Sequence, residues 1–491
     1  MALSISEIKS FIENSRDSKR KRRAAVGQRY YNAEHDILKL RFFYYNADGE
    51  LVEDVARANI KISHPFFTEL ADQLAAFVLS FKDNPIRAKD NASGLQDILD
   101  TYFDDDFWSE ISDLITGAYT KGWEFIFGYK NEDNKMAFQC ADCLCVEEIS
   151  ARDAADGKDH VLYWYRDTTE KGKKSVWRIQ DWDANETRYY IQVGRTGQIE
   201  PDKDAPINPR PHVVYTDGET GQRMGYGLGY IPFWRLDNNK MQASGLKPIK
   251  GLIDDYDLMQ CGLSNNLTDF DTPLHVVSGF QGDNLDELQK NLKTKKIIGV
   301  DTEGDVQIRT VEIPYQARQA KAGEDEKNIY RFGMGFNSSA VGDGNITNVV
   351  IRSRYTLLEL KAGKMERRLK KLLKKIVGVV IDEVNAEYGR AYKVSDVYFD
   401  FVHAIMTNET ENLSNERVKA ETRQIEVNTI LNVAAHVGDE QTLKALCEVM
   451  DWPYDELKGQ LEKMADDQDM EAARAALGGV VTDEQEGEAG T

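Results

Sequence analysis

The sequence predicts an α+β fold built from more than one domain. In the first half of the chain, helix-like segments are followed by segments in which apolar and polar residues alternate as they do on strands. An apolar stripe with helical spacing then runs through residues 246–270, and a stronger, almost unbroken one runs through residues 365–384. With 491 residues, the chain is long enough to bury a large core.

The N-terminal half is predicted to contain four helices followed by several strands. The helix over residues 65–81 has the clearest apolar face, which includes Phe67, Leu70, Leu74 and Val78. The predicted helices cover residues 4–23, 65–81, 95–102 and 107–122. The predicted strands cover residues 123–129, 136–146, 160–165, 176–179 and 188–193.

The central helix is predicted from an apolar stripe at three- and four-residue steps. From residue 246 to residue 270 it would be roughly 37 Å long, at about 1.5 Å per residue. Carboxylates and amides occupy its other faces, without a catalytic constellation. The stripe consists of Leu246, Ile249, Leu252, Ile253, Tyr256, Met259, Leu263, Leu267 and Phe270.

A small unit and a second, polar helix come next. The pattern predicts a short helix at residues 285–292, a strand at 297–300, a turn at 302–305 and a strand at 306–313. Pro314 is suited to the first turn of a helix that continues to about Phe336. So polar a helix would be marginal alone in water, which favours neighbours that are copies of itself. Residues 337–345 are small and polar and predict a loop.

The strongest helical pattern follows this loop. It begins near Val349, has an almost unbroken apolar seam, and ends near Tyr388, with Gly389 as its C-terminal cap. The seam consists of Met365, Leu369, Leu372, Leu373, Ile376, Val377, Val380, Ile381 and Val384. The pattern then predicts a strand at residues 397–402, helices at 415–437 and 440–464, and a Glu- and Gly-rich tail with too little apolar content to fold.

The long helix also carries a basic face opposite its seam. This face could contact a neighbouring subunit, could contact DNA, or could pair within the helix with Glu359 and Glu366. Subunit contact is the first interpretation and DNA contact the second. The candidate contact residues are Lys361, Lys364, Arg368, Lys371 and Lys375.

The composition excludes several classes of protein. The formal net charge of −21 is the reverse of what a tight duplex-binding protein carries, because neutralising phosphates supplies much of the affinity for DNA. No apolar run approaches the roughly 18 residues of a membrane helix, and the N-terminal segment lacks the order of a secretory signal. Five cysteines in this length favour a reducing compartment. We therefore expect no membrane partner.

Three cysteines are the first candidates for a metal site. Cys140, Cys143 and Cys145 lie close together, but no second Cys or His pair follows at the spacing that zinc sites use. Alternation on a strand would make Cys143 and Cys145 small buried hydrophobes instead. We expect no metal and no cofactor.

Catalytic interpretations are equally weak. The run of Asp104, Asp105 and Asp106 could bind a divalent cation, but aspartates also favour the N-cap and first turn of a helix. The GYGLG run at residues 225–229 lacks the lysine and the following helix of a phosphate loop. The seven histidines show no metal-protease spacing. We expect a protein that is not an enzyme.

One stretch carries a specific resemblance. Residues 231–282 resemble the strand that runs into the first stem helix in portal (head–tail connector) proteins of tailed bacteriophages, siphophage type. Residues 59–86 and 98–129 match that family in outline, mostly at apolar positions. The residues that match in order and spacing are Ile231, Pro232, Asn238, Asn239, Leu246, Ile249, Leu252, Ile253, Asp254, Tyr256, Ser264 and Asn266.

The resemblance implies a portal fold with a mixed α/β wing, a two-helix stem, a small α/β clip, a long channel-proximal helix and a helical crown, assembled as a ring. It implies a tunnel loop that rings the DNA, formed by Asn337, Ser338, Ser339, Ala340, Val341, Asp343 and Asn345. It divides the chain into wing (1–236), first stem helix (237–270), clip (271–313), second stem helix (314–336), tunnel loop (337–346), long helix and wing return (347–400), crown (401–474) and a disordered acidic tail (475–491).

The resemblance also implies a function. A portal forms a dodecameric ring at one capsid vertex, through which genomic DNA is packaged, retained and ejected, and joins head to tail. Its partners would be further copies of itself, double-stranded DNA without sequence specificity, the terminase large subunit, the major capsid and scaffold proteins, and a head–tail adaptor. It would assemble in the host cytoplasm and reside in the virion.

Two rival functions stay open at this point. One is another virion assembly or head-completion protein built from similar helices, which would lack a central bore. The other is a metal-dependent DNA-processing enzyme, whose nuclease activity would be abolished by Asp105→Asn.

Overall fold

The structure is a computed structural model of the whole chain. It describes residues 2–55, 57–89, 92, 94–131, 133–150, 157–167, 176–216, 222–269, 274–280, 300–309, 314–337, 348–401, 409–450, 452–454 and 457–459. The chain forms two compact units. Unit 1 contains Met1–Gly344 and Arg352–Ile405, and unit 2 contains Asn345–Ile351 and Met406–Thr491.

Two helices open the chain where the sequence predicts one. Helix α1 (Ile5–Arg16) begins with a capping box between Ser4 and Glu7, and α2 (Lys19–Tyr31) begins at Ser18, whose side chain accepts from the N–H of Lys21. Helix α1 ends at its C-cap Asp17, and Ser18 starts a new helix directly after it. The side chain of an N-cap residue such as Ser18 satisfies an N–H group that a helix start leaves unpaired. The expectation of a continuous helix over residues 4–23 is therefore wrong.

A five-strand antiparallel path, order β10-β9-β8-β7-β6, forms the largest sheet, with the short strand β11 paired to β9. Helix α1 covers part of it through Ile8 and Ile12, which pack with Leu162, Trp164 and Ile179. The strands are β6 (Val146–Ile149), β7 (His160–Asp167), β8 (Val176–Trp182), β9 (Glu186–Val193), β10 (Ile199–Pro201) and β11 (Arg210–Pro211).

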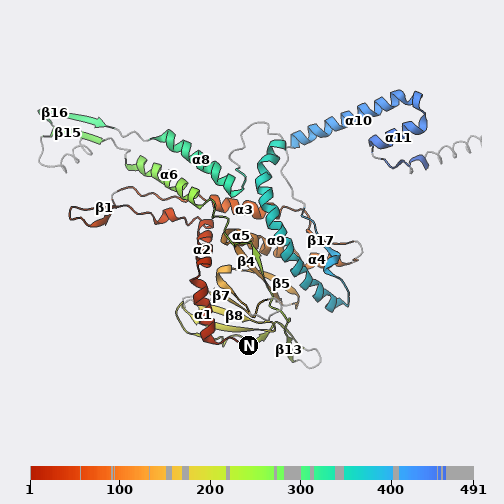
Figure 1. The fold of residues 1–491 in the computed structure, drawn as a ribbon, viewed down its shortest axis with the longest axis horizontal. Coiled ribbons are helices and arrows are strands. Elements are labelled where there is room, and N and C mark those ends of the chain that lie inside the picture. Colours follow the sequence, from red (N-terminus) through yellow and green to blue (C-terminus); the bar gives the residue numbers. More distant parts are fainter. Residues whose placement is uncertain are drawn as a thin grey trace, which may run out of the picture. The chain divides into compact units, whose positions relative to one another are not determined.

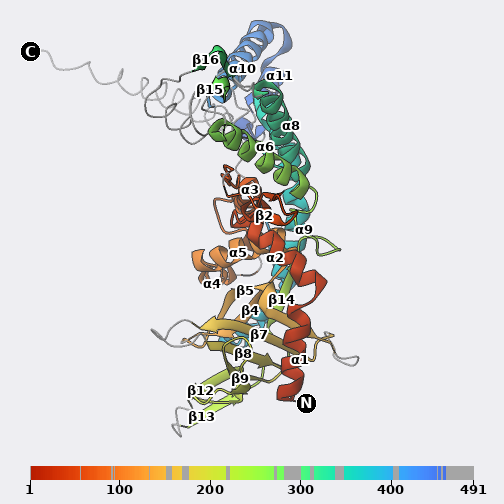
Figure 2. The same ribbon diagram turned by 90° about the vertical axis from the view of Figure 1, so that its left-hand side faces the viewer.

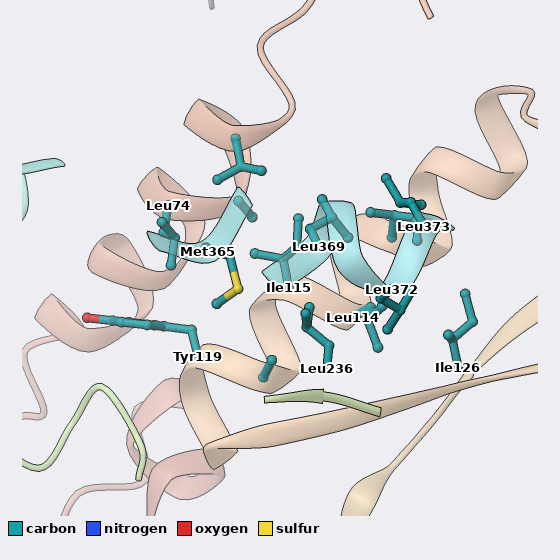
Figure 3. Packing of buried hydrophobic residues seen from close by; sticks show 14 of the residues in the cluster. Leu74, Leu114, Ile115, Tyr119, Ile126, Leu236, Met365, Leu369, Leu372 and Leu373 are labelled. Atoms are coloured by element: carbon teal, nitrogen blue, oxygen red, sulfur yellow. The ribbon is translucent and has the colours of Figure 1, made fainter. Parts of the chain in front are cut away.

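The main core lies around the long helix α9 (Asn348–Tyr388). Its predicted seam is confirmed, since every residue of it from Met365 to Val384 is buried. Figure 3 shows Leu369 and Leu372 of α9 facing Leu114 and Ile115. The helices and strands that pack here include α3 (Phe66–Val78), α4 (Leu95–Tyr102), α5 (Asp105–Lys121), β4 (Trp123–Lys130), β5 (Met136–Ala141) and β14 (Phe233–Asp237), the last three forming a sheet of order β14-β4-β5.

Two helices and a strand pair extend from this core. Helices α6 (Lys250–Asp269) and α8 (Tyr315–Gly333) lie side by side, and β15 (Leu274–Phe280) pairs with β16 (Val300–Arg309) between them in the sequence (Figure 1). Strand β16 runs through residues 302–305, so the turn predicted there is wrong. The register with β15 shifts at this point, because Ser278 pairs with Asp305 and Phe280 with Val300, so residues 301–304 form an irregular part of the strand. The helix predicted at residues 285–292 lies outside the described residues.

The remaining elements of unit 1 are short, and unit 2 contains two longer helices. In unit 1 they are the 3-10 turns η1 (Asp36–Lys39), η2 (Cys143–Cys145) and η5 (Val394–Asp396), and the pairs β1 (Phe43–Tyr45) with β2 (Leu51–Glu53), β3 (Ile86–Ala88) with β17 (Val397–Phe399), and β12 (Val213–Thr216) with β13 (Arg223–Tyr226). Unit 2 contains α10 (Glu409–Val437) and α11 (Asp439–Met450). Among the described residues, no helix has both the length and the apolar character needed to cross a membrane.

Candidate functional site: the paired helices and the loop base

Helices α6 and α8 are joined by an ion-pair bridge on their facing sides. The ammonium of Lys321 on α8 lies 2.6 Å from Asp255 Oδ2 on α6 and also contacts Asp325 one turn further along its own helix. Because Lys321 is partly exposed, water screens this bridge and its contribution to stability is modest. Its role is to align the two helices along their length.

On another face of α6, four side chains hold an extended segment, residues 58–64. Every fourth residue of the helix has a side chain that accepts a hydrogen bond from a backbone N–H of the segment. The donors are every second residue of the segment, so each side chain has its own N–H partner. We call this set the side-chain ladder. Its pairs are Asp269 with Ala58, Asn265 with Ile60, Cys261 with Ile62 and Asp257 with His64, at 2.9, 2.6, 3.2 and 3.0 Å.

The ladder follows from the two backbone repeats. Four helix residues rise about 6.0 Å and two extended residues span about 6.6 Å, so the same spacing recurs along both elements. Three of its members, Asp257, Cys261 and Asn265, are buried. The ladder thereby satisfies backbone N–H groups that have no strand partner in the described part of the chain.

Asp257 is the most connected member of the ladder. Its Oδ2 lies 2.6 Å from Nδ1 of His35, and its Oδ1 lies 2.7 Å from Nδ1 of His64. Burial alone would raise the pKa of Asp257, but the hydrogen bonds from both histidines hold this pKa below its usual value. The fold thus brings together two histidines that are distant in sequence, and they anchor α6 to the N-terminal part of the chain.

A second cluster fixes the start of α6. The Lys250 amine lies 2.8 Å from Asp36 Oδ2 and 2.7 Å from Asp254 Oδ2, and the hydroxyl of Tyr30 donates to Asp254. The ring of Tyr30 also stacks on His35 at 4.4 Å. Together with the ladder, these contacts hold the helix pair rigidly against the core at its inner end.

The apolar stripe predicted for α6 is buried only at its inner end. Leu246 and Ile249, which precede the helix, and Ile253 are fully buried. The described outer members are half-buried, apart from the exposed Leu267, because the ladder and not the stripe occupies the most buried face there; Phe270 lies outside the described residues. The half-buried members are Leu252, Tyr256, Met259 and Leu263.

The segment predicted as a tunnel loop is held at its base. The N–H of Phe336 donates to Gln73 Oε1 at 2.9 Å, and Gln73 Nε2 donates back to the carbonyl of Phe336 at 2.7 Å. The ring of Phe336 stacks on Tyr355 of α9, at 4.5 Å between centroids and 7° between planes. These contacts join Phe336, before the segment, to Tyr355, after it, and no local pattern in the sequence predicts these roles of Gln73 and Tyr355.

Of the predicted loop residues, only Asn337 lies within the described part of the chain. Its side-chain amide donates to Glu326 Oε1 on α8 at 3.0 Å. The predicted loop residues Ser338, Ser339, Ala340, Val341, Asp343 and Asn345 lie outside the described residues.

Lys361 lies at the same loop base. Its amine donates to the carbonyls of Gly333 at 3.0 Å and Leu70 at 3.3 Å, and it lies 4.5 Å from the ring centre of Tyr119. Burial lowers the pKa of Lys361 to about 7. The amine thus joins α9 to the end of α8 and to α3 within one subunit, and its contact with DNA or with a neighbour stays a prediction.

The other predicted basic residues lie on the part of α9 that follows Lys361. Lys364, Lys371 and Lys375 are exposed, and Arg368 is half-buried. No carboxylate among the described residues forms an ion pair with any of them. This unpaired positive charge is available to a partner.

A lysine amine lies among the side chains that could form a metal site. Side-chain atoms of Glu124, Asp142 and Cys143 lie within 4.8 Å of one another, but the Lys121 amine lies 2.8 Å from Asp142 and contacts Glu124. Burial would lower the pKa of Lys121, but the carboxylates of Glu124 and Asp142 raise it above its usual value. Lys121 therefore stays a charged ammonium and neutralises the negative charge that would attract a metal cation. Cys143 lies on the turn η2 and not on the predicted strand, and burial raises the pKa of its thiol.

The acidic run before α5 has the helix-capping role expected for it. The side chain of Asp104 accepts from the N–H of Phe107 at 3.0 Å, and Asp105 and Asp106 lie in the first turn of α5. Carboxylates are favourable there because of the partial positive charge of a helix N-terminus.

Comparison with known proteins identifies the family. The family described as "Phage portal protein, SPP1 Gp6-like" matches residues 11–473, which is most of the chain. The chain belongs to the SPP1 Gp6-like family of phage portal proteins. The resemblance inferred from the sequence is thereby confirmed. Proteins of this family are structural components of the virion capsid and not enzymes, in agreement with the prediction.

Two relatives show how far the similarity extends. The chain is 26% identical to the portal protein of Bacillus phage SPP1 over 350 residues, which cover 70% of this chain and 66% of that protein. It is 23% identical to the portal protein of Clostridium phage phiCD119 over 416 residues, which cover 77% of this chain and 82% of that protein. The first match therefore spans slightly less than two thirds of the relative's length.

Proposed function

We propose that the chain assembles into a closed ring of about twelve copies, whose bore conducts double-stranded DNA at one vertex of the capsid. The observation that carries the proposal is the helix pair α6–α8, which leads to a strand pair and leaves large apolar side chains exposed on its flanks. These are Leu258 and Leu267 on α6 and Tyr315 and Phe332 on α8, between 45% and 55% exposed. Neighbouring copies would cover them in a ring.

The β1–β2 hairpin supports the same proposal. Phe43, Tyr44 and Tyr45 are at least half exposed, as are Leu51 and Val55. A two-stranded hairpin alone is marginally stable in water, and apolar surface on it is usually covered by another element or subunit. A neighbouring copy would supply that cover.

Within such a ring, the parts of the chain take the roles that the family implies. Residues 1–236 would form the wing, α6 and α8 the stem, residues 271–313 the clip, and residues 401–474 the crown. The clip and the crown would contact the terminase large subunit, the capsid and scaffold proteins, or the head–tail adaptor. Twelve copies at −21 each would carry about −250, so DNA in the bore would meet repulsion at long range and slide.

Electron microscopy of the purified chain, together with native mass spectrometry, tests this proposal. We expect rings of about twelve copies with an open central bore. A discrete closed dimer would contradict the proposal, and an assembly without a bore would favour a scaffold or head-completion role.

Deleting residues 338–343 is expected to leave ring assembly intact and to reduce the retention of packaged DNA. The reason is that the loop base made by Gln73, Phe336 and Tyr355 would present this segment to the bore as a repeated polar ring, which contacts phosphates without reading sequence. The measurement is the fraction of DNA-filled heads produced by phage that carry the deletion.

The control for the deletion replaces the same residues with a Gly–Ser segment of equal length. Loss of retention in both variants would assign the effect to the side chains of the loop, and loss in the deletion alone would assign it to loop length. Packaging and retention that are both unchanged in the deletion would rule out the role proposed for this segment.

A further inference from the structure

A groove with unbalanced positive charge lies between α9 and β14. Its cavity has a volume of about 320 Å³. One wall carries Arg368, Lys371 and Lys375 from α9. The other wall carries β14 together with Glu148 and Lys158. We call this cavity the basic groove.

The acidic groups of the basic groove are already neutralised. Glu148 lies 2.8 Å from the amine of Lys158 and contacts the guanidinium of Arg235. Asp237 accepts from Arg235 Nε at 2.9 Å. Within the described residues, no carboxylate pairs with the three cations on the α9 wall, so the groove carries a net positive charge of about three on a chain that is strongly acidic.

A compact acidic surface lies where α4 ends and α5 begins. Asp105 and Asp106 are exposed in the first turn of α5, and Asp97 and Asp100 are exposed on α4. Asp104, between the two helices, is also exposed. In the described part of the chain, none of these five carboxylates forms an ion pair. We call this surface the acidic corner.

The basic groove and the acidic corner are separate surfaces of unit 1. Figure 2 shows α4 to the left and α9 to the right, and the two helices meet where the hydroxyl of Tyr102 at the end of α4 donates to Glu383 of α9 at 3.0 Å, eight residues beyond Lys375, the last cation of the groove. Two different, complementary patches at separate places on one subunit favour head-to-tail association, which closes into a ring when the rotation allows. Complementary charge also selects the partner and fixes the register between subunits.

We propose that the basic groove of each copy receives the acidic corner of the next copy. This inference rests on the ring proposed above and adds to it the two surfaces that meet. The acidic corner is favoured over DNA as the occupant because helices α4 and α5 hold its carboxylates in fixed positions, and because the acidic chain as a whole repels a polyanion. It is favoured over the acidic tail at residues 478–491 because the composition of the tail has too little apolar content to fold and so to fix its carboxylates in place.

Reversing the charge on each surface separately tests the inference. The groove variant is Lys371→Glu with Lys375→Glu, and the corner variant is Asp105→Lys with Asp106→Lys; Asp104 is kept because it caps α5. Each variant alone brings like charges together, so we expect it to form no rings under conditions in which the unchanged chain forms them. The readout is native mass spectrometry at low salt, with circular dichroism to show that each variant is folded.

An equimolar mixture of the two variants is the decisive sample. Each interface in an alternating ring then joins opposite charges, because the groove variant keeps its acidic corner and the corner variant keeps its basic groove. We expect rings to return, with an even number of copies and equal amounts of both variants. The matched control, Arg367→Glu with Lys374→Glu, reverses two exposed charges of α9 that do not line the cavity and are not among the predicted contact residues, and should form rings normally.

Several outcomes would overturn the inference. Rings formed by both single-surface variants would do so, as would a mixture that stays unassembled. Normal rings of the groove variant with weaker DNA retention would assign the groove to DNA, and lost assembly after truncation at Leu477 would assign it to the tail. If the unchanged chain forms no rings, the ring proposal fails first and this inference fails with it.

Discussion

Replacing Asp257 by alanine is expected to lower the free energy of unfolding by about 3–5 kcal/mol, as removing one partner from a buried charged pair does. Its carboxylate is fully buried and accepts from Nδ1 of His35, from Nδ1 of His64 and from the N–H of His64. Alanine leaves the fully buried Nδ1 of His35 without an acceptor, together with the two partly buried donors of His64. The helix α6 would also lose its attachment to the N-terminal part of the chain.

Chemical denaturation followed by circular dichroism measures this effect, with both proteins in the same oligomeric state. The matched control is Asp269→Ala, which removes another member of the side-chain ladder at an exposed position. Because water can replace its bond to Ala58, we expect a loss of only about 0.5–1 kcal/mol there. Equal losses in the two variants would contradict the special role of Asp257.

The pH dependence of Asp257→Ala gives the same prediction an independent readout. The pKa of Asp257 is lowered in the fold, so its contribution to stability is complete above the unfolded value of 3.8 and is lost as the pH falls through the lower folded value. The loss of stability caused by the substitution should therefore be largest near neutral pH and shrink in acid below pH 3.8.

Replacing Gly122 by alanine is expected to cost about 2–5 kcal/mol. Gly122 ends α5 with φ +105°, which costs an L-residue about 1–2 kcal/mol. A Cβ there would also lie 2.3 Å from the carbonyl oxygen of Gln242, and the displacement that follows adds about 1–3 kcal/mol. The obstacle is backbone, so a rotamer change cannot relieve it.

Gly194→Ala separates the two causes. Gly194 has φ +71°, but no atom lies within 4 Å of the position its Cβ would take. We therefore expect the conformational cost alone, about 1–2 kcal/mol. Thermal unfolding of both variants makes the comparison, and equal losses would show that the contact with Gln242 yields without cost.

The sequence predicts those parts of the fold in which periodicity and burial agree. The seam of α9 is buried throughout, α8 follows Pro314 as expected, and Asp104 caps α5. Each of these depends on neighbours within a few turns of the same helix, which is the range over which a sequence pattern carries information. The family resemblance over residues 231–282 is local in the same way, because it follows the order and spacing of residues along one continuous stretch through β14 and α6.

The buried polar face of α6 was decided by the tertiary structure alone. The sequence shows Asp257, Cys261 and Asn265 on one helix face, but nothing local distinguishes them from solvated residues, and the apolar stripe competes for the same prediction. Their burial depends on His35 and on residues 58–64, some two hundred positions away. The N–H groups of Ile60, Ile62 and His64 donate to these side chains and to no other partner within the described residues. A buried polar side chain is stable only when hydrogen-bonded, and the partners that make it so are brought into reach by the folded chain and not by the sequence pattern.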